Sequence, residues 1–126
     1  MKHSTFMAIA AVLALVVGLA LLLIPAQATS LYGITLESGG QWIARCLGSA
    51  FLGAAVTTWF GKNAPQGDAL RAILLGDFAL AVTGLIATVL YSIFGSANAL
   101  IWSSTAIYAF LTAGFGYFRF VKSASS

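Results

Sequence analysis

Four long stretches of apolar residues follow one another along the chain, separated by short polar connections. They cover residues 6–24, 40–61, 72–94 and 99–118. A bilayer core of ~30 Å needs ~20 consecutive apolar residues for each helical crossing, and each stretch has roughly that length. The pattern predicts an all-α fold, an integral membrane four-helix bundle that forms a single transmembrane domain over residues 1–126. We expect its helices at about 6–24, 40–61, 69–94 and 98–120.

The composition supports a membrane domain. Hydrophobic residues make up 60% of the chain and charged residues 7%, whereas about 25% of an ordinary soluble domain is charged. Outside the apolar stretches only connections and tails remain, which are too short to build a separate aqueous domain.

Basic residues predict the orientation in the membrane. Five of the six Lys and Arg residues fall on one side of the predicted membrane: Lys2, Lys62, Arg71, Arg119 and Lys122. Basic residues in short loops favour the cytoplasmic side, so we expect both termini inside. Because these residues are scattered at helix ends and form no stripe on one face, they do not indicate a nucleic-acid partner.

The first apolar stretch has an alternative interpretation. The basic start at Lys2 and the small-residue triplet 26–28 resemble a secretory signal with its cleavage site. The apolar run of roughly 19 residues is longer than the 7 to 15 typical of a signal. We therefore expect an uncleaved first helix.

Small residues recur along each stretch at the spacing of one helix face. Because lipid tails are as apolar as leucine side chains, membrane helices associate through close packing of small residues and through hydrogen bonds. The rows either hold the bundle together or line a polar pathway. They comprise Ala10, Ala14 and Gly18; Arg45, Ser49, Gly53 and Thr57; Asp77, Ala81, Gly84, Thr88 and Tyr91; and Ser104, Tyr108, Thr112 and Gly116.

Two charged residues lie well inside the apolar stretches. A rise of ~1.5 Å per residue places Asp77 ~9 Å into the core from the cytoplasmic side and Arg45 ~7 Å from the outer side. An intramembrane carboxylate usually faces the bundle, pairs with another group, or marks an ion or proton path. Arg45 could pair with Asp77, extend outward to the headgroups, or contact the outer loop near Glu37.

Motifs for catalysis or metal binding are absent from the sequence. His3 and Cys46 are each the sole residue of their type, and the acidic residues Glu37, Asp68 and Asp77 fall at three membrane levels. These residues form neither a metal-ligand set nor a carboxylate pair for acid–base chemistry. We expect no enzyme activity, no metal site and no cofactor. Whether a quinone, pigment or lipid lies between the helices is left open.

Several short segments follow one another in a recognisable order. They are Leu31-Tyr32-Gly33, then Ala44-Arg45 with Gly48, Leu52-Gly53 and Trp59, then Asn98-Ala99-Leu100 with Trp102, and finally Gly114-Phe115-Gly116-Tyr117. This succession resembles a family of small four-helix bacterial membrane proteins of unknown function. The resemblance implies a multi-pass protein of the bacterial inner membrane and importance for Arg45, Asn98 and Trp102, whereas Asp77 is not matched to a position of the pattern.

Two functional hypotheses follow. The first is a non-catalytic accessory or scaffold subunit that lies in the lipid bilayer and associates with other membrane proteins, or with copies of itself, through helix packing. The alternative is a small oligomeric transporter or channel whose polar intramembrane path includes Asp77 and Arg45, with Ser49, Thr88, Asn98 and Trp102 as further polar candidates.

Overall fold

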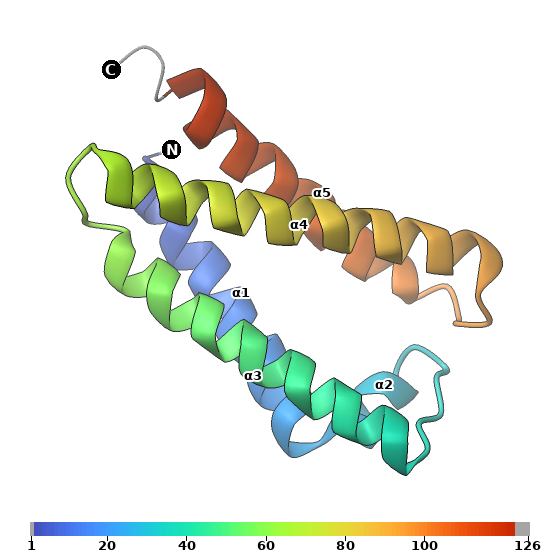
Figure 1. Ribbon diagram of the computed structural model, residues 1–126. Helices are drawn as coiled ribbons and strands as arrows, with labels where there is room; N and C mark the ends of the chain where they lie inside the picture. Colours follow the sequence, from blue (N-terminus) through green and yellow to red (C-terminus); the bar gives the residue numbers. More distant parts are fainter. Residues whose placement is uncertain (1, 123–126) are drawn as a thin grey trace.

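The computed structural model describes residues 2–122, and all regular secondary structure in this range is helical (Figure 1). The all-α prediction is confirmed for this part of the chain. The elements are α1 (His3–Leu23), α2 (Pro25–Ser30), α3 (Ser38–Gly61), α4 (Asp68–Phe94), α5 (Ile101–Gly116) and a π-helical extension, η1 (Tyr117–Lys122).

Within the described residues, three helices are long and apolar enough to cross a membrane. They are α1, α3 and α4, with 21, 24 and 27 residues. The α-helical part of the fourth apolar stretch, α5, has 16 residues, which at 1.5 Å per residue reach about 24 Å.

The connection predicted after the first helix is itself partly helical. The sequence predicts a connection after residue 24, but a short second helix, α2, begins at Pro25. Proline suits the first position of a helix because its missing N–H needs no partner there and its φ angle is already helical. The chain turns at Ile24, whose backbone is not helical.

The long helices form two pairs. Helix α1 packs along α3 and α4 packs along α5, while contacts between the pairs are far fewer. Figure 1 shows the pairs meeting near the end that carries the N-terminus and the α3–α4 connection, and separating toward the other end. The arrangement is therefore two helix pairs rather than four helices packed together over their whole length.

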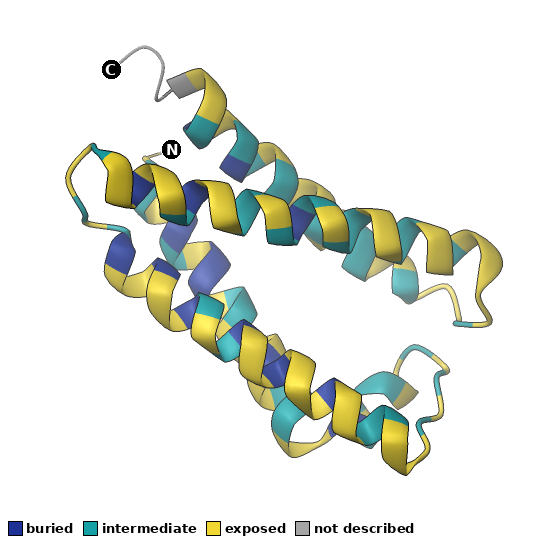
Figure 2. Cartoon of the chain, in the orientation of Figure 1, coloured by how far each residue is buried: buried dark blue, intermediate teal, exposed yellow. Residues whose placement is uncertain are grey.

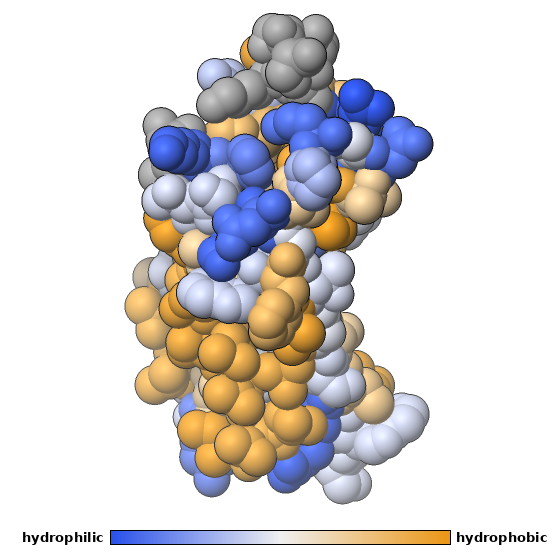
Figure 3. Space-filling view, turned by 90° about the vertical axis from the view of Figure 1, so that its left-hand side faces the viewer, coloured by the Kyte–Doolittle hydropathy of each residue, from blue (hydrophilic) through white to orange (hydrophobic). Residues whose placement is uncertain are grey.

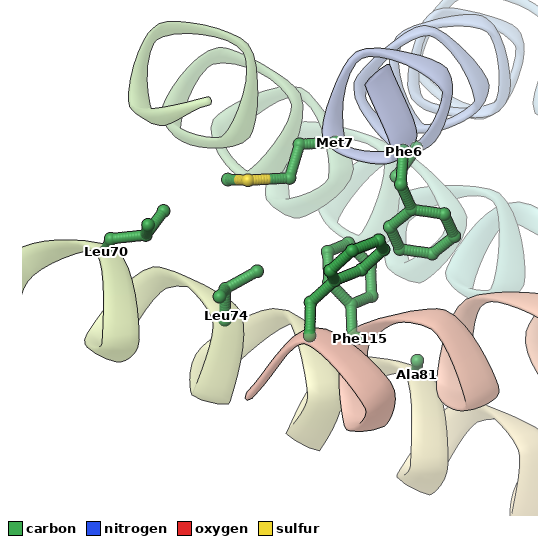
Figure 4. Packing of buried hydrophobic residues seen from close by; sticks show 8 residues of the cluster. Phe6, Met7, Leu70, Leu74, Ala81 and Phe115 are labelled. Atoms are coloured by element: carbon green, nitrogen blue, oxygen red, sulfur yellow. The ribbon is translucent and has the colours of Figure 1, made fainter. Parts of the chain in front are cut away.

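A cluster of buried apolar side chains holds the two pairs together where they meet (Figure 4). The Phe6 ring centroid in α1 lies 4.9 Å from that of Phe115 and 5.4 Å from that of Phe110, both in α5. Gly114 makes room for this ring, since a Cβ atom there would collide with it. The buried members of the cluster are Phe6, Met7, Ala10, Leu70, Leu74, Ala81, Phe115 and Phe118.

The α1–α3 contact corrects one sequence prediction. The predicted inward row of the second long helix is wrong, because Arg45, Ser49, Gly53 and Thr57 are all exposed. The buried positions follow one another at steps of four or three residues and are Ala44, Gly48, Phe51, Ala55, Thr58 and Gly61. In Figure 2 the buried positions of α3 lie along one side and the exposed positions along the other.

The outer surface of the helices is strongly apolar. Large exposed side chains include Val16, Ile43, Phe60 and Phe94. Figure 3 shows hydrophilic residues toward both ends of the molecule, more of them at one end, and a broad apolar zone between. Such a surface is suited to lipid, because a soluble protein rarely exposes so large a contiguous apolar area.

A candidate functional site between the helix pairs

A cavity of about 230 Å³ lies between the two helix pairs. All four long helices contribute to its wall, which is mainly aliphatic and aromatic. Its lining consists of Ala10, Leu13, Ala14, Val17, Leu21, Tyr32, Leu47, Phe51, Ala54, Thr58, Asp77, Leu80, Ala81, Ser104, Ile107, Tyr108, Leu111 and Phe115. The buried cluster around Phe6 borders it, since Ala10, Ala81 and Phe115 belong to both.

Asp77 is the acidic residue of this wall. Its Oδ2 atom accepts a hydrogen bond of 2.6 Å from Thr58 Oγ1, which joins α4 to α3. Thr58 is only 3% exposed and is the buried polar residue of α3. The bond therefore fixes the carboxyl group against one side of the cavity and leaves Oδ1 as a free acceptor among the described residues.

Two hydroxyl-bearing residues of α5, Ser104 and Tyr108, lie on the cavity wall with Asp77. The Tyr108 ring packs against Gly84 of α4, where a Cβ atom would collide with it. Neither hydroxyl group has a hydrogen-bond partner within residues 2–121, whose side chains the structure describes. Both are therefore available to a molecule in the cavity.

Asn98 connects the helix pairs at the opposite end from the Phe6 cluster. Its backbone N–H donates to the Tyr32 carbonyl at 2.8 Å, and its side-chain Nδ2 donates to the Leu31 carbonyl at 3.0 Å. Its Oδ1 atom accepts from the Leu100 N–H at 3.0 Å, at the start of α5. Gly33, at φ +73°, lies directly against it. Asn98 thus links the connection before α3 to the connection before α5 through two hydrogen bonds.

Arg45 does not line the cavity. Its Nη1 atom donates to the carbonyl oxygen of Leu22 in the last turn of α1, so the exposed side chain joins α3 to α1. Of the predicted possibilities, direct pairing with Asp77 does not occur: the ion pair present among the described residues joins Arg71 to Asp68.

The remaining predicted polar candidates also lie outside the cavity wall. Ser49 is exposed and donates to the Cys46 carbonyl at 3.3 Å. Thr88 donates to the Gly84 carbonyl of its own helix, and Trp102 is half exposed near the start of α5. The structure therefore brings Asp77 alone, of the six predicted residues, to the cavity.

Sequence reasoning missed Thr58, the residue that binds Asp77. Its position could have been found from the alternative row Ala44, Gly48, Phe51, Ala55 and Thr58, whose steps of four and three residues keep it on one helix face. The contact of Gly48 with α1 shows that this row is the one that packs inward.

The chemistry available at this site is limited to one carboxyl group and nearby hydroxyl groups. Within the described residues no three His, Cys, Asp or Glu side chains gather to hold a metal ion. A lone carboxylate in an apolar wall can accept hydrogen bonds, carry a proton or attract a cation.

Comparison of the chain with protein-family models, with characterised proteins and with solved structures gives no match. The resemblance drawn from the sequence stays a prediction.

Proposed function

We propose that this chain is a non-catalytic, four-span protein of the bacterial inner membrane, with both termini in the cytoplasm, that serves as an accessory subunit for another membrane protein. Helices α1, α3 and α4 supply three spans. Helix α5 continues without a break into η1, so the fourth apolar stretch has a helical length close to that of a crossing.

The arrangement of the basic residues supports the proposed orientation. Figure 1 places the N-terminus, the α3–α4 connection and the end of α5 toward the same end of the molecule. Lys2, Lys62, Arg71 and Arg119 lie in these segments or in the helical turns next to them, as expected for a cytoplasmic side. Reporter fusions at the two termini test the orientation, and activity of a periplasmic reporter at either end would refute it.

The observation that carries the accessory role is the outward row of α3, formed by Arg45, Ser49, Gly53 and Thr57. Polar groups on a lipid-facing surface are costly, while small residues allow close approach of a second helix. A Cβ atom at Gly53 would meet nothing within 4 Å. The occupant best suited to this row is a transmembrane helix of another protein, with acceptors for the Thr57 hydroxyl group and for the guanidinium N–H groups of Arg45 that do not bond to Leu22.

The test compares two small-to-large variants after extraction in a mild detergent. Gly53→Leu places a bulky side chain in the middle of the row, whereas Ala109→Leu makes a similar change at an exposed position of α5. We expect the wild type and Ala109→Leu to be recovered with the same larger partner and Gly53→Leu to be recovered without it. A complex that contains only copies of this chain, or a partner retained by Gly53→Leu, would overturn the accessory role.

A transporter or channel is the second candidate, favoured by the position of Asp77 on an intramembrane cavity. Arg45 lies outside this cavity. A transport path through the cavity would therefore use Asp77 and would not use Arg45. Purified protein in liposomes should then move a small solute, and Asp77→Asn should abolish the movement.

A further inference from the structure

The cavity between the helix pairs has a polarity that selects its occupant. Apart from Asp77 its polar lining consists of uncharged hydroxyl residues, and hydrocarbon side chains make up the rest. Among the side chains described, those of residues 2–121, no basic group lies within ion-pair distance of Asp77, since the ion pair they form is Arg71–Asp68. The ionised carboxylate would therefore have Thr58 as a donor but no positive charge beside it.

The alternatives to a cationic ligand fit less well. A lipid acyl chain gains nothing from a carboxylate, and an anionic molecule would be repelled by it. A bare metal cation needs several oxygen or nitrogen ligands, and the described residues offer no such set.

Aromatic side chains add a second attraction for positive charge. Phe51, Tyr108 and Phe115 lie on the wall with Asp77, and aromatic faces attract cations electrostatically, ammonium groups among them. The aliphatic residues around them favour an apolar body. The volume, about 230 Å³, is below the ~300–1,000 Å³ of sites for drug-sized ligands, so the ligand is small.

We propose that this cavity binds a small monovalent organic cation with an apolar body, its positive group beside the Asp77 Oδ1 atom and its hydrocarbon part among the side chains of α1 and α5. The site requires both helix pairs, because Asp77 comes from one and part of the apolar wall from the other. This inference concerns binding alone and is independent of the partner proposed for the outward row of α3.

The test uses two probes of the same shape and different charge. Benzyltrimethylammonium carries a permanent positive charge, and neopentylbenzene is its neutral hydrocarbon counterpart. Binding of each to the purified full-length chain in lipid nanodiscs is measured by equilibrium dialysis. We expect saturable binding of the cation to the wild type.

Matched variants assign the binding to Asp77. Asp77→Asn keeps an oxygen that can accept from Thr58 but removes the charge, and we expect it to bind the cation about tenfold or more weakly. Asp68→Asn removes an exposed carboxylate outside the cavity and should bind like the wild type. The neutral probe should not distinguish the wild type from Asp77→Asn.

A second pair of variants covers the case in which Asp77→Asn fails to fold. Ala54→Phe fills part of the cavity and should abolish cation binding, whereas Ala50→Phe changes an exposed position of the same helix and should not. Absence of saturable cation binding to the folded wild type would overturn the proposal. Equal cation affinity of folded Asp77→Asn and the wild type, or unchanged binding by Ala54→Phe, would overturn it as well.

Discussion

Gly18 of α1 and Gly48 of α3 meet backbone to backbone. A Cβ atom added to Gly48 would lie 2.7 Å from the carbonyl oxygen of Gly18, and one added to Gly18 would lie 2.9 Å from the carbonyl oxygen of Gly48. Glycine at both positions lets the helix axes approach more closely than any side chain would allow. This close packing substitutes for a hydrophobic driving force, which is lacking between helices in lipid.

Gly48→Ala should loosen the α1–α3 pair. Overpacking of a tight contact typically costs about 1–3 kcal/mol, and here the clash is with backbone atoms, which cannot move aside alone. Unfolding of the isolated chain by titration of a mild detergent with a denaturing one, followed by circular dichroism, measures the loss. Gly53→Ala, which meets open space, should stay within about 0.5 kcal/mol of the wild type. Equal stability of all three proteins would argue against the glycine contact.

Phe6→Ala should separate the helix pairs at the end where they meet. The Phe6 side chain is 2% exposed and its ring contacts three other rings, so its removal should cost roughly 3 kcal/mol. Phe60→Ala serves as the matched control, because Phe60 is 78% exposed. The same unfolding titration measures both variants, and a larger loss for Phe60→Ala would contradict the assigned core.

Thr58→Val tests the hydrogen bond that positions Asp77. The substitution keeps the size of the side chain and removes the donor to Asp77 Oδ2. We expect a loss of about 0.5–1.5 kcal/mol in the free energy of unfolding, the range for one such bond. Thr57→Val, one residue away and exposed, should have little effect. If both substitutions leave stability unchanged, the Thr58–Asp77 bond contributes nothing measurable.

Asn98→Ala should release the fastening at the end of the molecule opposite the Phe6 cluster. It removes the donor to the Leu31 carbonyl and the acceptor for the Leu100 N–H. Hydrogen exchange of the amide of Leu100 should become faster, by the factor that corresponds to about 1 kcal/mol. Asn98→Asp keeps the acceptor and should preserve the protection of the Leu100 amide. Asn63→Ala, in the α3–α4 connection, should leave the exchange rate of Leu100 unchanged. Unchanged exchange in Asn98→Ala would rule out the fastening.

The predicted site shows where sequence reasoning stops. Asp77 was identifiable because a carboxylate in a long apolar stretch is costly and conspicuous. Its partner Thr58 was not, since threonine is common in membrane helices and forms bonds within its own helix equally well, as Thr83 and Thr88 do. Arg45 was as conspicuous as Asp77. Its position along the helix, however, does not predict which group its long side chain contacts, and in the structure that group is the Leu22 carbonyl.

The sequence by itself determined that this chain is helical and suited to lipid. The length and polarity of each apolar stretch show that the segment needs lipid as its solvent, and a segment in lipid must satisfy its backbone hydrogen bonds within a helix. Only the tertiary structure decided which face of α3 meets α1. The row through Gly48 advances by four and three residues and the row through Gly53 by four, and both contain small residues; the backbone contact with Gly18 shows that the row through Gly48 is the one that meets α1. The same choice buries Thr58 and turns it toward Asp77, and it leaves Arg45 on the outer surface. The cavity likewise follows from the angle between two helix pairs, which local periodicity does not encode.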